Sequence, residues 1–218
     1  MLFDLRGRRR RAVQATYLLL ALLMGGGLVL FGIGGDVSGG LLNAFDGGGG
    51  PSADSAFQKQ IDKREERLKT NPRNEAIVAN LVRDYYSLAT SQRPEGSVGF
   101  PADAKDELQK AGSYWQRYTK LTDDPSPAVA GYALQVYDVN GLNRPKEAQK
   151  AAAILAADSN DAASYLRLVS YAARAGDTRT ADLAGQKAVD LAPKDQRKLI
   201  EKQVEALKKA PQAQQPSG

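Results

Sequence analysis

The side chains that most often carry enzymatic chemistry are scarce in this chain. Its 218 residues include no cysteine and no histidine. Without them the chain cannot form a disulfide, a thiolate nucleophile, a zinc site of cysteine and histidine, or an imidazole general base. Carboxylates remain, and these can hydrolyse glycosides or hold hard cations, but no pair of them is marked out by its spacing. We therefore expect a protein that is not an enzyme and that uses no metal and no cofactor.

Two turn-rich segments could in principle bind phosphate or calcium, and neither has the pattern that this chemistry requires. Gly47 to Gly50 is not followed by a Lys-Ser or Lys-Thr pair, so it does not match a phosphate-binding loop. Asp123 and Asp124 are adjacent and lack the spaced oxygen ligands of a calcium loop. No small-molecule substrate is evident from the sequence.

The start of the chain has a basic cluster followed by an apolar run. The cluster consists of Arg6, Arg8, Arg9, Arg10 and Arg11. Residues 12–35 contain no Asp, Glu, Lys or Arg, and about 20 apolar residues span a bilayer as a helix. We therefore expect a single transmembrane helix over 12–35. A cleaved signal peptide is the alternative, although its apolar core is usually shorter, about 7 to 15 residues.

The position of the arginines predicts the topology. Lys and Arg flanking a membrane helix stay on the cytoplasmic side, so residues 1–11 are expected in the cytoplasm. The carboxy-terminal part would then lie outside a bacterial cytoplasmic membrane, as part of a single-pass protein. The net charge of the whole chain is +5, and residues 1–11 account for +4 of it, with five Arg against Asp4. The remaining charge of about +1 gives no support for nucleic-acid binding.

The rest of the chain predicts one all-α domain between two unstructured segments. Residues 36–55 are rich in glycine and are expected to form a flexible linker, and 211–218 a disordered tail. Within 56–210, apolar residues recur at helical spacing. The expected helices cover 56–70, 75–89, 102–121, 128–140, 145–157, 162–175, 178–191 and 194–210. A breaker-rich loop occupies 91–101, and Phe100 at its end could pack against the domain.

Small and large residues occur at set positions in a pattern that resembles the tetratricopeptide repeat, a helix-turn-helix unit of 34 residues. The clearest copy covers 162–194, and weaker copies cover 75–121 and 127–160, followed by a capping helix from Lys194. The resemblance implies a solenoid of helical hairpins, and a generic helical bundle is the alternative. The residues of 162–194 that carry the resemblance are Tyr165, Leu168, Gly176 at the turn, Ala181 and Ala188 at close helix contacts, and Pro193.

The repeat resemblance also implies a binding surface, because the first helices of the hairpins usually line it. Arginine binds carboxylates in a bidentate manner and tyrosine offers a large contact area with a polar tip, so an acidic extended peptide would fit. An ordinary solvated face is the alternative. Trp115 and Tyr118 are expected in the core instead. The expected surface positions are Asn80, Arg83, Tyr86, Tyr132, Gln135, Val139, Arg167, Ser170 and Arg174.

Two functions from different classes are compatible with this organisation. The first is a membrane-tethered interaction module that holds a protein or peptide partner. Its architecture is similar to that of single-pass periplasmic repeat proteins that assist the bacterial Sec translocon, which implies handling of translocating or envelope proteins. The second is a structural scaffold, in which the chain supports a homo-oligomer or an envelope membrane complex.

Overall fold

The computed structural model describes residues 53–209, and all regular structure in this part of the chain is helical. The all-α prediction is therefore confirmed for these residues. The elements are α2 (Ala53–Thr70), α3 (Glu75–Ser91), the short 3-10 helix η1 (Ala102–Ala104), α4 (Lys105–Tyr118), α5 (Pro127–Tyr137), α6 (Pro145–Ser159), α7 (Ala162–Ala175), α8 (Thr178–Leu191) and α9 (Arg197–Lys208).

The predicted fold class included a transmembrane helix, and this part of it needs correction. None of the helices within 53–209 is long and apolar enough to cross a membrane. The segment expected to do so, residues 12–35, lies outside the described residues, as do the five topology arginines, most of the expected linker and the expected tail. The location and topology inferred from these segments stay predictions from the sequence.

Several helix ends differ from the sequence expectation for local reasons. Helix α2 begins at Ala53, so the last three residues of the expected linker, 53–55, are helical. The helix expected over 102–121 divides into η1 and α4, which ends at Tyr118. The helix expected over 128–140 ends at Tyr137, whose carbonyl accepts from the backbone N–H of Arg144 at 2.9 Å in a compact turn. Helix α9 begins at Arg197, after a turn closed between Pro193 and Gln196.

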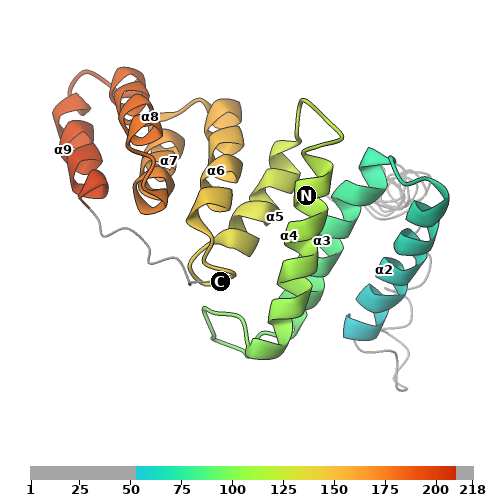
Figure 1. Ribbon diagram of the computed structural model, residues 1–218. Coiled ribbons are helices and arrows are strands. Elements are labelled where there is room, and N and C mark those ends of the chain that lie inside the picture. The colour runs from blue at the N-terminus through green and yellow to red at the C-terminus, as the bar shows by residue number, and fades with distance from the viewer. Residues whose placement is uncertain (1–52, 210–218) are drawn as a thin grey trace, which may run out of the picture. The chain divides into compact units, whose positions relative to one another are not determined.

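The helices follow one another in chain order, and each packs mainly against its neighbours in sequence (Figure 1). Two further contacts join helices that are not consecutive: α3 with α5, and α7 with α9. Short connections, such as the two residues Gly176 and Asp177 between α7 and α8, make consecutive helices antiparallel hairpins. Of the first helices of successive hairpins, α3 and α5 are in contact, whereas α5 and α7 are not.

Side-chain caps and left-handed residues fix the helix ends. The side chains of Asn74, Asp161 and Asp177 each accept from a backbone N–H three residues later, at 3.0, 2.8 and 3.0 Å. The N–H of Ser164 holds the pKa of Asp161 below its ordinary value. Gly176 ends α7 with φ of 75°, a backbone conformation that glycine adopts without a Cβ clash, as the sequence predicted for this turn.

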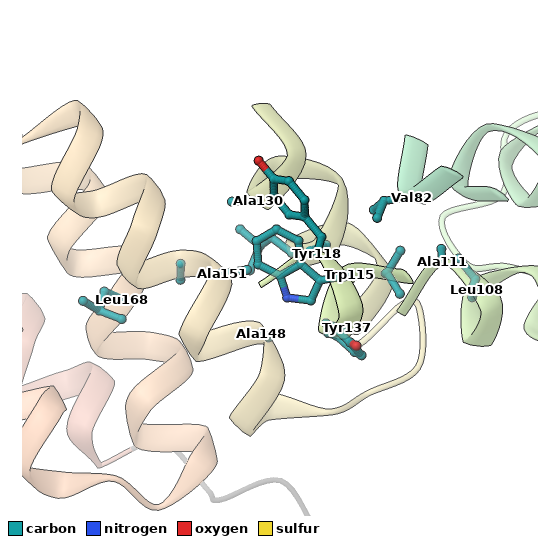
Figure 2. Close-up of a cluster of buried hydrophobic side chains, with 14 of the residues drawn as sticks. Val82, Leu108, Ala111, Trp115, Tyr118, Ala130, Tyr137, Ala148, Ala151 and Leu168 are labelled. Atoms are coloured by element: carbon teal, nitrogen blue, oxygen red, sulfur yellow. The ribbon is translucent and has the colours of Figure 1, made fainter. Parts of the chain in front are cut away.

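The core changes character along the chain. Near its middle it contains the aromatic rings of Trp115 and Tyr118, whose centroids are 5.8 Å apart, and both residues are buried as expected. Figure 2 shows these rings together with Ala130 of α5 and Ala151 of α6. Towards the carboxy terminus, alanines dominate the buried contacts, namely Ala148, Ala151, Ala152, Ala156, Ala172, Ala181, Ala184 and Ala188.

Polar side chains of α2 contact both α3 and α4. Arg64 forms an ion pair with Asp84, a carboxylate of α3 that is only 2% exposed. Burial raises the pKa of Asp84 above its ordinary value, and the guanidinium groups of Arg64 and Arg83 offset part of that rise. Glu65 accepts from the hydroxyls of Tyr85 and Tyr114 at 2.6 and 2.9 Å. We call these contacts the polar clasp.

The clasp also changes the acidity of the two phenols. Their rings are stacked with centroids 5.6 Å apart. Burial, together with the hydrogen bond to Glu65, raises the pKa of Tyr85 and brings that of Tyr114 to about 12. Both hydroxyls therefore stay protonated at neutral pH and can donate to the carboxylate. Helix α2 also has an apolar contact with the domain, with Ile61 and Leu68 buried and Phe57 packed against the core.

Candidate interaction surface

Two residues that the sequence assigned to the binding surface meet in the structure. Tyr86 of α3 and Tyr132 of α5 come from different hairpins, and their ring centroids are 5.5 Å apart. Phe100 extends the contact, because its ring lies 6.2 Å from that of Tyr86 in an edge-on arrangement. All three side chains are partly buried and pack against the core. We call Tyr86, Phe100 and Tyr132 the aromatic row.

The loop that ends in Phe100 folds back onto α3, as the sequence suggested. The guanidinium carbon of Arg93 lies 4.2 Å from the centroid of the Phe100 ring, within the range of a cation–π contact. The Nε of Arg93 is buried and has no hydrogen-bond partner in the described structure. Arg93 is not among the surface positions expected from the sequence. The one sequence feature that could have pointed to Arg93 is its position between α3 and the proline- and glycine-rich turn.

The other candidates on α3 have local contacts of their own. Arg83 is 44% exposed at its side chain, and its Nε lies 3.5 Å from the buried Asp84 carboxylate. The side chain of Asn80 donates to the carbonyl of Ala76 within the same helix, at 2.9 Å. Arg83 and Asn80 precede Tyr86 on α3 by one and two turns, so the aromatic row continues into a polar stretch.

On α5 and α7 several candidates face solvent. Gln135 of α5 and Arg167 of α7 are exposed, and Ser170 is half-buried. Val139, just beyond α5, is 52% exposed. No hydrogen bond or ion pair of their side chains is found within 53–209, so Gln135 and Arg167 are available to a partner.

Arg174, in contrast, is held inside the fold. Its Nη1 lies 3.8 Å from Oδ1 of Asp138, and its Nη2 donates to Asn143 at 3.3 Å. The hydroxyl of Tyr171 donates to the same Asp138 oxygen at 3.0 Å. Burial and this carboxylate raise the pKa of Tyr171 to about 12. The network joins α7 to the end of α5, two helices that make no close backbone contact, so Arg174 has a clear structural task.

Among the residues expected at this surface, the charged groups without a close ion pair are arginines, and Glu95 of the adjoining loop is an exposed carboxylate. Asp84 and Asp138 are both engaged by arginines, whereas Arg83, Arg93 and Arg167 retain donors that are not committed to a close ion pair. In the part of the chain that the structure describes, no three carboxylates gather in a way that could hold a metal ion. The surface therefore combines aromatic area with positive charge, which suits a partner that carries both apolar and acidic groups.

Comparison with known proteins adds little to this description. No protein-family model matches the chain, and no solved structure matches it. A stretch of 79 residues is 37% identical to part of the C2H2-type transcription factor MSN2 of Beauveria bassiana (strain ARSEF 2860), covering 35% of this chain and 16% of that protein. The chain thus spans about a sixth of the length of this curated relative. It has no cysteine and no histidine with which to build a Cys2His2 zinc site, so the similarity assigns it to no family.

Proposed function

We propose that residues 53–209 form a helical-hairpin domain of tetratricopeptide type that binds a protein or peptide partner. The observation that carries the proposal is the contact between Tyr86 and Tyr132. These residues occupy equivalent first helices of successive hairpins, and their rings lie 5.5 Å apart beside exposed side chains. A surface that continues from hairpin to hairpin is what an extended chain needs as a binding site.

The chemistry of the surface supports a protein partner over a small molecule. Aromatic side chains and arginine are enriched at protein interfaces because they combine apolar area with hydrogen-bonding groups. The aromatic row and Arg83 provide this combination on α3, α5 and the loop before η1, and Arg167 of α7 adds a further exposed arginine. Such a surface acts by holding a partner and contains no nucleophile with a neighbouring base, so the proposal includes no reaction.

The proposal is tested by photo-crosslinking the full chain in the cells that produce it. A photoreactive residue is placed at Gln135 or at Arg167, both exposed on the proposed surface. Matched controls carry it at Gln109 of α4 and Lys187 of α8, which are equally exposed on the second helices of their hairpins. Covalent products are identified by mass spectrometry. We expect the same partner at Gln135 and Arg167 and not at the two control positions.

The same experiment separates binding from scaffolding. If all four positions capture the same product at similar yield, or if the surface positions capture nothing, the proposed surface is wrong. If Gln135 and Arg167 capture a second copy of this chain, the surface serves self-assembly and the scaffold function takes its place.

A further inference from the structure

Arg93 differs from the other arginines of the domain in how it is held. Arg64 is paired with Asp84, and Arg174 with Asp138. None of the ion pairs among residues 53–209 includes Arg93. Its contact is instead with the face of the Phe100 ring, at 4.2 Å from guanidinium carbon to centroid. The positive charge is therefore positioned by an aromatic ring and is not neutralised by a carboxylate.

A guanidinium that lies over an aromatic ring can keep hydrogen-bonding capacity for a further partner. The cation–π contact uses the face of the planar group, whereas the five N–H donors point outwards in its plane. Burial of Nε without a partner leaves the two Nη groups, at the outer end of a side chain that is only partly buried, as the donors that a bound molecule can reach. A carboxylate can accept from both Nη groups at once.

Arg93 is also continuous with the proposed binding surface. Contacts run without a break from Arg93 to Phe100, from Phe100 to Tyr86 at 6.2 Å, and from Tyr86 to Tyr132 at 5.5 Å. A partner lying across the aromatic row would therefore reach Arg93 at one end. Because the ring already fixes the guanidinium, little side-chain entropy is lost when a carboxylate binds there.

We infer that Arg93 is the carboxylate-binding residue of this surface, and that its partner is a peptide segment with an acidic group next to apolar or aromatic residues. The loop 91–101 is then part of the binding site, with Phe100 positioning Arg93. This inference rests on the proposed function, since it names the partner chemistry of the same surface.

The test is a selection from a random twelve-residue peptide library displayed against the full chain. Wild type is compared with Arg93→Gln, which removes the charge, and with Arg93→Lys, which keeps it. The matched control is Arg73→Gln, an exposed arginine at the opposite end of α3. Circular dichroism melting of each variant confirms that it is folded before selection.

We expect wild type and Arg73→Gln to enrich peptides with an Asp or Glu beside aromatic or apolar residues. Arg93→Gln should retain the apolar preference and lose the acidic one, and Arg93→Lys should keep both. For one selected peptide, Arg93→Gln should weaken binding about tenfold or more, the scale of a lost charge-assisted hydrogen bond. Amidating the carboxy terminus of that peptide distinguishes a terminal carboxylate from a side-chain carboxylate.

The two proposals fail in different ways. If wild type enriches no peptide, the proposed function is wrong and the inference falls with it. If wild type enriches peptides without acidic residues, or if Arg93→Gln enriches the same acidic peptides as wild type, the peptide-binding surface stands and the role of Arg93 is overturned.

Discussion

The helices of the amino-terminal and carboxy-terminal parts of the described domain are held together by different kinds of contact. From α2 to α5, over residues 53–137, large aromatic rings and the polar clasp fill the contacts between helices. From α6 to α9, over residues 145–208, helices approach closely across alanine and glycine, as at Ala181, Gly185 and Ala188. Truncating a large buried side chain leaves a cavity and destabilises the fold. Where two helices pack closely across small residues, an added side chain clashes and destabilises the fold instead. The aromatic part should therefore be damaged by truncation, and the alanine part by enlargement.

The largest expected effect is that of Trp115→Ala in the aromatic part. The indole is 4% exposed and packs against Tyr118, and truncation of a buried aromatic side chain costs about 3–5 kcal/mol. Urea unfolding followed by circular dichroism measures the loss. The matched change in the alanine part, Ala151→Gly, should cost only about 1 kcal/mol, mostly through helix propensity. Equal losses at the two sites would contradict the comparison.

Arg64→Met breaks the polar clasp and is expected to cost about 3 kcal/mol, because it leaves the buried Asp84 carboxylate without its main partner. The double change Arg64→Met with Asp84→Leu removes both charges and should recover most of the loss, since apolar replacement of a buried pair is often neutral. Chemical denaturation of the two variants gives the answer. A double variant as unstable as Arg64→Met alone would show that the clasp is not the cause.

Gly185→Ala tests the alanine part in the opposite direction. A Cβ at this position would lie 2.5 Å from Cγ1 of Val204 in α9, so α9 has to shift, at a cost of about 1–3 kcal/mol. In a Val204→Ala background the obstacle is gone, and Gly185→Ala should instead stabilise the helix by up to about 1 kcal/mol. Thermal melting of the four variants in this cycle checks the reversal of sign. The comparison loses its basis if Gly185→Ala has the same sign in both backgrounds.

A further expected effect is a loss of stability at alkaline pH, with Tyr114 and Tyr137 as its sources in the aromatic part. Burial raises the pKa of Tyr114 and Tyr137 to about 12, above the ordinary value of about 10 for an unfolded tyrosine. The protonated phenols therefore stabilise the fold fully below about pH 10, and this contribution is lost as the pH rises through about 10 to 12. Urea midpoints measured from pH 8 to 11.5 should fall above pH 10, and less steeply in Tyr114→Phe. An identical slope in that variant would argue against Tyr114 as a source.

The sequence predicts the parts of this domain that depend on local periodicity. Trp115 and Tyr118 are identifiable as core residues because they recur at helical spacing with other apolar residues, and Gly176 marks its turn because few other residues adopt that backbone. The polar clasp could not be foreseen in this way. Asp84 stands on the apolar face of α3 beside Val82 and Tyr85, but its partners are on another helix, and the sequence does not say which charged residue of α2 reaches it.

The candidate surface shows the same limit. The spacing of the repeat resemblance placed Tyr86 and Tyr132 at positions that prove to be in contact, since both depend on regular helix register. The spacing of the repeat does not distinguish an exposed arginine from one in an ion pair. Arg174 pairs with Asp138 because of the tertiary arrangement of α7 and the end of α5, which the spacing does not specify. Arg93 was not predicted as a binding residue, because residues in an irregular loop show no helical or strand periodicity.

The contact between Tyr137 and Gly112 limits how this sequence can change over time. The hydroxyl of Tyr137 donates to the carbonyl of Gly112 at 2.9 Å, and a Cβ on Gly112 would lie 2.9 Å from that hydroxyl oxygen. A side chain at position 112 is therefore disfavoured for as long as position 137 carries a phenol. The constraint runs in one direction across two helices: a side chain at position 112 requires a smaller residue at position 137, whereas a smaller residue at 137 leaves glycine at 112 acceptable.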